Sequence, residues 1–207
     1  NDLGVPLTIL DAEHAKFLVA EVGANDIGEI DPLAKLVLPD IAVITSIDKA
    51  HLEGFLDKST ALSEKVKLLE AIPRGGFAVI PEEIDVSEFS LDATICSVGY
   101  SSSADVQIET SINEEGFGTL RIGEDCVTLS MLGEHNARNG ALAVVACTFA
   151  CPEVSIKECM SRLSCVDAPK GRVCKYKIDE LTFIDDSYKI LKLDHQIIKD
   201  GRCKKVD

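Results

Sequence analysis

The sequence predicts an α/β fold: a mostly parallel sheet flanked by helices, with a small antiparallel β patch and the start of a second α/β domain. Short β-like runs alternate with helical patterns through the first half, which is typical of βαβ units. Between about residues 95 and 132 the pattern changes to short alternating segments separated by Gly and acidic turns, which favours antiparallel pairing. With 207 residues, 46% of them hydrophobic, the chain can bury a sizeable core.

The first half contains three predicted β-like runs and two helices, which alternate along the chain. In order, we expect a strand over 16–21, a helix over 31–37, a strand over 41–45, a helix over 59–71 and a strand over 77–80. Ser59 is the predicted N-cap of the second helix. This order predicts a parallel sheet with helices on both faces.

The second half returns to helix after the β patch, over 136–150 and 155–163. A linker over 167–171 precedes two strand-like runs, 172–178 and 181–184, which open a second domain. From residue 189 onward the composition changes, because six Lys or Arg stand against three Asp in an otherwise acidic chain. We therefore predict three segments: a central domain over 1–168, the start of a C-terminal domain over 169–188, and a divergent basic tail over 189–207.

The net charge of -14 argues against a nucleic-acid or anionic-membrane partner, because no basic surface dominates to neutralise phosphates. No apolar run is long enough to span a bilayer, and the first residues lack a signal-peptide pattern. We expect a cytoplasmic protein and, in the absence of any oligomer signal, a monomer. The eight cysteines include no CxxC pair, so we interpret most of them as buried thiols.

Two candidate site residues follow predicted strands. Glu21 ends the first strand and His51 follows the second by a short loop, so both side chains are expected at the carboxyl edge of the sheet, where α/β folds bind ligands. A carboxylate there suits Mg²⁺. Read alone, Glu21 is better explained as a surface acid at the end of a strand and His51 as a structural histidine, so the pair only suggests a site. Lys65 lies in a predicted helix, where nothing in the pattern distinguishes it from Lys58 or Lys67.

Taken together, several motifs resemble those of the Mur ligases, in the same order along residues 1–188. They are Glu-Val-Gly-Ala-Asn at 21–25, Gly-Glu-Ile at 28–30, Ala-His-Leu-Glu-Gly-Phe at 50–55, Lys65 at its matching spacing, Gly-Glu-His-Asn-Ala-Arg-Asn at 133–139, and Gly-Arg at 171–172 with Ile-Asp-Asp-Ser-Tyr at 184–188. The first two motifs are most similar to the member that adds D-alanyl-D-alanine.

The resemblance implies a metal site formed by Glu21, His51 and Lys65. The matching lysine is carbamylated in this family, which converts a cation into a carboxylate-like ligand for Mg²⁺. Glu21 would hold one Mg²⁺ beside the phosphates of ATP, while His51 and modified Lys65 would hold a second. Two cations would spread the charge that develops in phosphoryl transfer.

The resemblance also implies a nucleotide site. Asn139 would meet the adenine, since an amide can pair with both a donor and an acceptor edge, and His135 and Asn136 would shape the same pocket. Arg172 would approach the nucleotide from the linker, and Asp186 would bind the ribose hydroxyls. Without the resemblance, Asn136 and Asn139 are better explained as helix-capping or surface residues.

The activity implied is ATP-dependent amide-bond formation in peptidoglycan precursor synthesis. The carboxylate of UDP-N-acetylmuramoyl-tripeptide would become an acyl phosphate, which D-alanyl-D-alanine then attacks. The Gly-Lys-Thr/Ser loop of the family occurs nowhere in the 207 residues, and Asp-Asp-Ser-Tyr is not followed by the family's Asn-Ala-Asn-Pro. We therefore expect a fragment that begins just after that loop, binds ATP weakly, leaves Lys65 unmodified and is inactive alone. The alternatives are another Mur or folylpolyglutamate-type ligase, and a non-catalytic remnant or interaction module.

Overall fold

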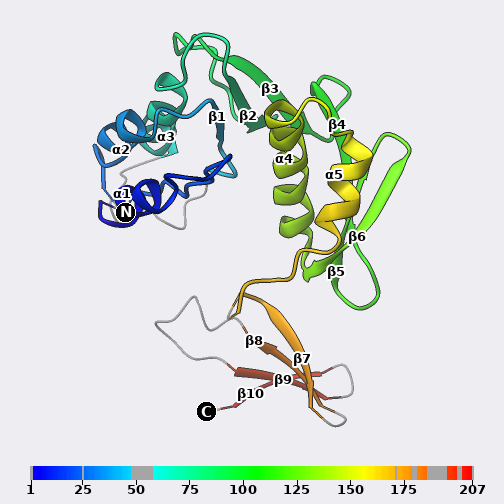
Figure 1. Cartoon of the computed structure of the whole chain (residues 1–207). Helices are drawn as coiled ribbons and strands as arrows, with labels where there is room; N and C mark the ends of the chain where they lie inside the picture. The colour runs from blue at the N-terminus through cyan, green and yellow to red at the C-terminus, as the bar shows by residue number, and fades with distance from the viewer. Residues whose placement is uncertain are drawn as a thin grey trace. The chain divides into compact units, whose positions relative to one another are not determined.

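The computed structural model (Figure 1) describes most of the chain, in two compact units. The described residues are 2–24, 26–47, 58–170, 172–178, 181–185, 195–199 and 202–206. The first unit comprises residues 1–107 and 145–152, and the second comprises 108–144 and 153–207. Each unit is described by itself.

The strands of the first unit are parallel. They are β1 (Ile41–Val43), β2 (Phe77–Pro81), β3 (Thr94–Gly99) and the beginning of β4 (Val106–Ile112). β1 pairs with β2 from Ile41 opposite Phe77, and β2 pairs with β3 from Phe77 opposite Thr94. A helix connects β1 to β2, so the predicted βαβ unit and parallel sheet are confirmed.

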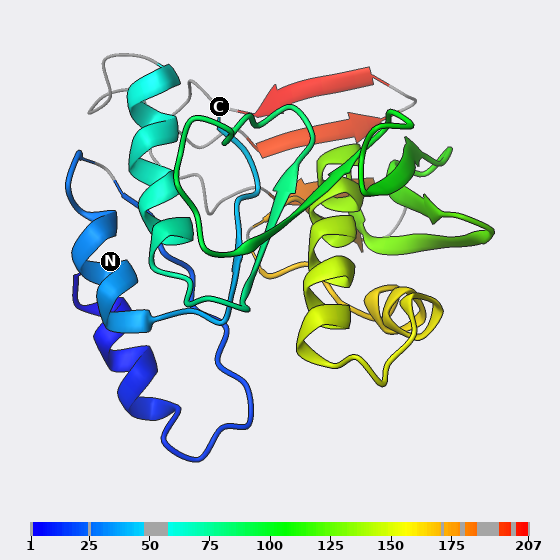
Figure 2. The same cartoon turned by 90° about the horizontal axis from the view of Figure 1, so that it is seen from above.

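Three helices accompany these strands: α1 (Gly4–Asp11), α2 (Ile30–Val37) and α3 (Lys58–Glu70). They lie next to one another on one side of the unit in both views (Figures 1 and 2). The predicted helices over 31–37 and 59–71 are confirmed. Ser59 lies inside α3, so its prediction as the N-cap is wrong.

The core of the first unit lies between α3 and the strands. Val66 and Leu69 of α3 are completely buried, and they cluster with Ile44 after β1 and with Ala78 and Ile80 of β2. These apolar side chains are removed from water together, which is the main force that holds α3 on the sheet. The packing therefore fixes the direction of every other side chain on α3.

The predicted strand over 16–21 is absent. Residues 15–24 are in no helix or strand, and Phe17, Leu18 and Val19 are exposed, Val19 by 92%. A short apolar run becomes a strand only when a neighbouring strand pairs with its backbone, and β1 is hydrogen-bonded in the described ladders to β2 alone. The apolar run therefore predicted a strand that the tertiary structure does not form.

β3 and β4 are parallel neighbours although only six residues connect them. Asp105 stabilises this short connection, because its carboxylate accepts hydrogen bonds from the backbone N–H of Ser97 at 2.8 Å and from the Ser97 hydroxyl at 2.7 Å. Those bonds, the backbone bond first, hold the pKa of Asp105 below its usual value, since they favour the ionised form.

The stability contributed by Asp105 is expected to disappear in acid. Because its pKa is lowered in the folded state, the contribution is complete above the unfolded value of about 3.9 and is lost as the pH falls through the folded value. Asp105→Asn should lower the melting temperature at pH 7 and flatten its decline below pH 4, as scanning calorimetry from pH 7 to 2 would measure. Asp92→Asn, at an exposed position, is the charge control; an equal flattening in both variants would contradict the expectation.

The second unit contains the antiparallel patch that the sequence predicts. The rest of β4 pairs with β5 (Phe117–Ile122), which pairs with β6 (Asp125–Leu132). Helix α4 (Glu134–Ala150), whose last residues belong to the first unit, follows β6, and then comes α5 (Ile156–Leu163). Ser155 caps α5, since its side chain accepts from the N–H of Glu158 at 3.2 Å.

A four-stranded antiparallel sheet ends the second unit. Its order is β10 (Arg202–Val206), β9 (His195–Lys199), β8 (Leu181–Asp185) and β7 (Cys174–Ile178). The two predicted strand-like runs are thus confirmed as β7 and β8, and β9 and β10 lie in the segment predicted as a basic tail. The three predicted segments do not coincide with the two compact units, and their boundaries stay predictions.

Two further expectations concern composition. Of the seven cysteines whose side chains are described, only Cys96 and Cys174 are buried, so the interpretation of most cysteines as buried thiols is wrong. Within the described ranges, no helix is both long and apolar enough to cross a membrane.

Candidate functional site

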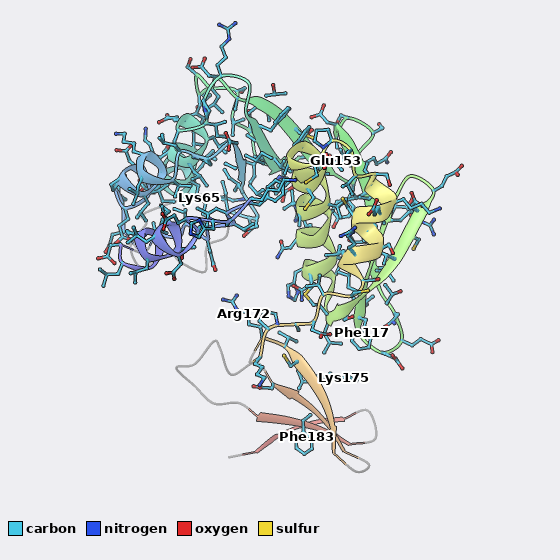
Figure 3. All side chains as sticks on the ribbon, viewed as in Figure 1. Lys65, Phe117, Glu153, Arg172, Lys175 and Phe183 are labelled. Atoms are coloured by element: carbon cyan, nitrogen blue, oxygen red, sulfur yellow. The ribbon has the colours of Figure 1, made fainter. Side chains whose placement is uncertain are left out.

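Lys65 stands at the carboxyl end of β1. Its half-buried side chain (labelled in Figure 3) leaves α3 and donates a hydrogen bond from Nζ to the backbone carbonyl of Ser46 at 2.5 Å. Ser46 follows β1 by three residues, so the amine of Lys65 reaches the edge of the sheet where α/β folds bind ligands. Lys67, by contrast, pairs with exposed Glu70 at 2.8 Å, and Lys58 is exposed. The structure thus distinguishes Lys65 from the lysines that sequence pattern alone could not exclude.

Glu21 lies in the irregular segment that replaces the predicted first strand, and its side chain is exposed. It therefore does not end a strand, because no strand is present there. Its position at the sheet edge, as inferred from that strand, is left as a prediction.

Glu64 is a residue that sequence reasoning missed. Its side chain is 5% exposed, and Oε1 accepts hydrogen bonds from the backbone N–H groups of Gly28 at 2.9 Å and Ile30 at 2.8 Å. These bonds attach the segment that follows Glu21 to α3. One signal was available in the sequence: Glu64 occupies the buried face of α3, together with Ala61 and Leu69, where a charged residue is unusual.

Two predicted site residues cannot be placed. His51 and Asp186 lie outside the described residues, as does Asn25 of the first motif. Within the part of the chain that is described, no three His, Cys, Asp or Glu side chains gather closely enough to hold a metal ion. A metal site built from Glu21, His51 and Lys65 is therefore neither assembled nor excluded by the described residues.

The candidate nucleotide residues on α4 belong to the second unit and share its first turns. Asn136 donates from Nδ2 to the Leu132 carbonyl at 2.8 Å, which braces the turn between β6 and α4. The ring of His135 lies against Gly133, where an added Cβ would come within 2.7 Å of Cε1. Asn139 is exposed. One donor of the Asn136 amide is therefore engaged by the fold itself, whereas Asn139 presents its amide to solvent.

Arg172 lies just before β7, and its backbone N–H donates to Pro169 at 3.0 Å. Three residues later, Lys175 lies over the ring of Phe117 at 5.4 Å and donates to the Glu115 carbonyl at 3.0 Å (Figure 3). Sequence reasoning did not single out Lys175. Its two contacts attach the beginning of β7 to the turn that precedes β5, within the second unit.

The fold and the site define an α/β domain with a lysine at the carboxyl edge of a parallel sheet, a pattern suited to binding a charged ligand. Residues 1–147 match the Mur ligase middle domain, so the chain belongs to the Mur ligase family, as the motifs indicated.

Similar proteins extend this match across the chain. The UDP-N-acetylmuramoyl-tripeptide--D-alanyl-D-alanine ligase of Haemophilus influenzae is 30% identical over 217 residues, covering 100% of this chain and 45% of the relative. The enzyme of the same name from Bacillus subtilis is 27% identical, over 91% of this chain and 42% of the relative. A crystal structure of MurF from Acinetobacter baumannii superposes with a TM-score of 0.78 at 31% identity, over 90% of this chain and 42% of that one. The chain thus spans less than half the length of these relatives.

Proposed function

We propose that this chain forms the central part of a ligase that joins D-alanyl-D-alanine to UDP-N-acetylmuramoyl-tripeptide at the expense of ATP, in the cytoplasm. Relatives that match 100% and 91% of this chain are named UDP-N-acetylmuramoyl-tripeptide--D-alanyl-D-alanine ligase. The observation that supports the proposal most is the hydrogen bond from the Lys65 amine to Ser46 beyond the end of β1, at the edge of the sheet where α/β folds bind ligands. The two Asn residues on the first turns of α4 agree with a nucleotide site.

In the proposed metal site, Glu21, His51 and Lys65 would hold Mg²⁺. As an ammonium donating to Ser46, Lys65 repels a divalent cation. The donor set fits Mg²⁺ only if the neutral amine forms an N–C bond with CO₂ and releases a proton, which leaves a carbamate whose oxygens are hard ligands. Bound Mg²⁺ would stabilise the charge that develops during phosphoryl transfer.

A nucleotide site would be formed by Asn136, Asn139, Arg172 and Asp186. Asn139 is exposed and can offer both a donor and an acceptor to adenine. Asn136 keeps one donor on Leu132, so its contribution to the base is to shape the pocket. Arg172 would supply a cation to the nucleotide phosphates, and Asp186 would accept from the ribose hydroxyls.

The reaction requires more than these residues. ATP would phosphorylate the tripeptide carboxylate, and the amine of D-alanyl-D-alanine would attack the acyl phosphate, forming the amide and releasing phosphate. A Gly-Lys-Thr/Ser loop, which would cradle the transferred phosphate, is not among the 207 residues. We therefore propose that the chain supplies part of the catalytic site and does not turn over alone.

A chimeric ligase tests this proposal. In the H. influenzae enzyme, the matched segment would be replaced by residues 1–188 of this chain, so that the relative supplies the remaining parts. We expect phosphate release that requires both the tripeptide substrate and D-alanyl-D-alanine, and loss of at least about a hundredfold in kcat when Lys65→Ala is introduced. Lys67→Ala is the matched control on the same helix.

The chimera can also contradict the proposal. A folded chimera, as judged by circular dichroism, that releases no phosphate would reject the ligase role of these residues. Turnover with a single amino acid in place of the dipeptide would indicate another member of the family. Equal rates for the Lys65 and Lys67 variants would remove Lys65 from the site.

A further inference from the structure

Glu64 is a buried charge that the proposed reaction does not use. Among the described residues it is the charged side chain that the structure buries, on the face of α3 that packs toward α2. Burying a carboxylate is unfavourable unless hydrogen bonds replace its water. The hydrogen bonds that the Glu64 carboxylate accepts must therefore explain why it is buried.

What it binds is the backbone of a segment more than thirty residues earlier. Oε1 accepts from the N–H of Gly28 and from the N–H of Ile30, the first residue of α2. Glu29, at the N-cap of α2, makes no side-chain cap hydrogen bond, and Glu64 accepts from another helix the N–H of Ile30, one of the donors at the beginning of α2 that have no partner within the helix. The negative charge also complements the positive end of α2.

The consequence is a direct link between two parts of the candidate site. Glu64 is the immediate neighbour of Lys65 on α3, and Gly28 is seven residues beyond Glu21. Gly28 has φ of +90°, a conformation that residues with a Cβ rarely adopt, so the turn presents its N–H to Glu64 at a fixed place. The helix that orients Lys65 therefore also holds the end of the loop that carries Glu21.

We propose that Glu64 is a positioning residue that holds residues 26–30 against α3 and thereby sets where Glu21 stands relative to Lys65. The link itself follows from the hydrogen bonds; its role in arranging metal ligands rests on the proposed function. The length of the Glu64 side chain matters most for these bonds, because both N–H groups donate to the same carboxylate oxygen. An amide of the same length can make them, whereas a shorter carboxylate cannot.

Two substitutions separate the effect of side-chain length from the effect of charge. Glu64→Gln keeps the acceptor and removes the charge, and Glu64→Asp keeps the charge and withdraws the acceptor by one methylene. Amide hydrogen exchange followed by NMR should show exchange at Gly28 and Ile30 faster by on the order of tenfold in Glu64→Asp, and within about threefold of the unsubstituted chain in Glu64→Gln. Glu70→Gln and Glu70→Asp, at an exposed residue in the last turn of α3, should change neither amide.

The amide of Leu69 reports whether the unit remains folded, since its side chain is completely buried. Slow exchange at Leu69 with fast exchange at Gly28 and Ile30 in Glu64→Asp supports the proposal. Fast exchange at those two amides in a folded Glu64→Gln overturns it, and this variant decides the question even if Glu64→Asp does not fold. Unchanged exchange in a folded Glu64→Asp overturns it as well.

Mn²⁺, a paramagnetic substitute for Mg²⁺ with the same preference for oxygen ligands, separates this inference from the proposed function. Mn²⁺ should broaden the NMR signals of the Glu21 segment and of α3 in the unsubstituted chain. If the broadening on α3 is smaller in Glu64→Asp, the result supports both this inference and the proposed function. With bicarbonate added as the source of CO₂ for the Lys65 carbamate, absence of NMR line broadening in every variant, together with the exchange difference, rejects the metal site and retains Glu64 as the residue that holds the loop. Equal broadening of α3 in both Glu64 variants overturns the positioning of Glu21 by Glu64.

Discussion

Leu69→Ala is expected to lower the free energy of unfolding by about 2–5 kcal/mol. Leu69 is 0% exposed and lies in the cluster formed by α3, the end of β1 and β2, together with Val66 and Ile80. Removing its branched end takes away apolar contacts and leaves a cavity that the parallel strands cannot close by moving, since ladder hydrogen bonds hold them. Domains of this size are stable by only about 5–15 kcal/mol, so the change removes a large part of the total.

Equilibrium unfolding in urea, followed by circular dichroism, measures this change. Leu36→Ala is the matched control, because Leu36 lies on α2 in the same unit and is 50% exposed. It should cost about 1 kcal/mol or less. Similar losses for the two variants would show that α3 is not held on the sheet by the packing described above.

The sequence predicted those helices and strands whose apolar periodicity is clear within the segment itself. The helices α2, α4 and α5 and the strands β1 and β2 were all expected within a few residues of their bounds. Helix α1 was not expected; Pro6 is tolerated in it because it lies in the first helical turn, where its missing N–H has no partner to lose. The strand over 16–21 failed for the opposite reason, because its formation depends on a pairing partner that no local pattern reports.

The candidate site was predictable only in part. Periodicity places Lys58, Lys65 and Lys67 on one helix but cannot say which amine reaches the sheet; the hydrogen bond to Ser46 does. Glu64 was missed because its charge on the buried face of α3 was not used as a signal, and because residue identity does not report its partners, which are backbone N–H groups. His51 was singled out by its place after a predicted strand, and Asp186 by the family motifs alone. Both residues lie outside the described residues, and their roles stay predictions.

Calorimetric titration of this chain with ATP and Mg²⁺ is expected to show no binding in the micromolar range. A micromolar dissociation constant requires about 8 kcal/mol of binding free energy, and in ligases with a Gly-Lys-Thr/Ser loop much of it comes from backbone N–H groups and a lysine around the phosphates. That motif does not occur in the 207 residues. A contact between Asn139 and the base cannot replace it, and Asn136 already donates one N–H to Leu132. We expect a dissociation constant of about a millimolar or weaker.

The H. influenzae ligase, titrated in the same buffer, is the positive control for that measurement. Asn139→Ala in this chain tests whether any residual heat comes from the proposed nucleotide site, and Asn113→Ala, in the turn between β4 and β5, is its counterpart. A micromolar constant that Asn139→Ala weakens and Asn113→Ala does not would show that the chain binds ATP without the phosphate loop. That result would require another set of phosphate contacts, and Lys65 and Arg172, the two cations among the candidate residues, would then be the first to substitute.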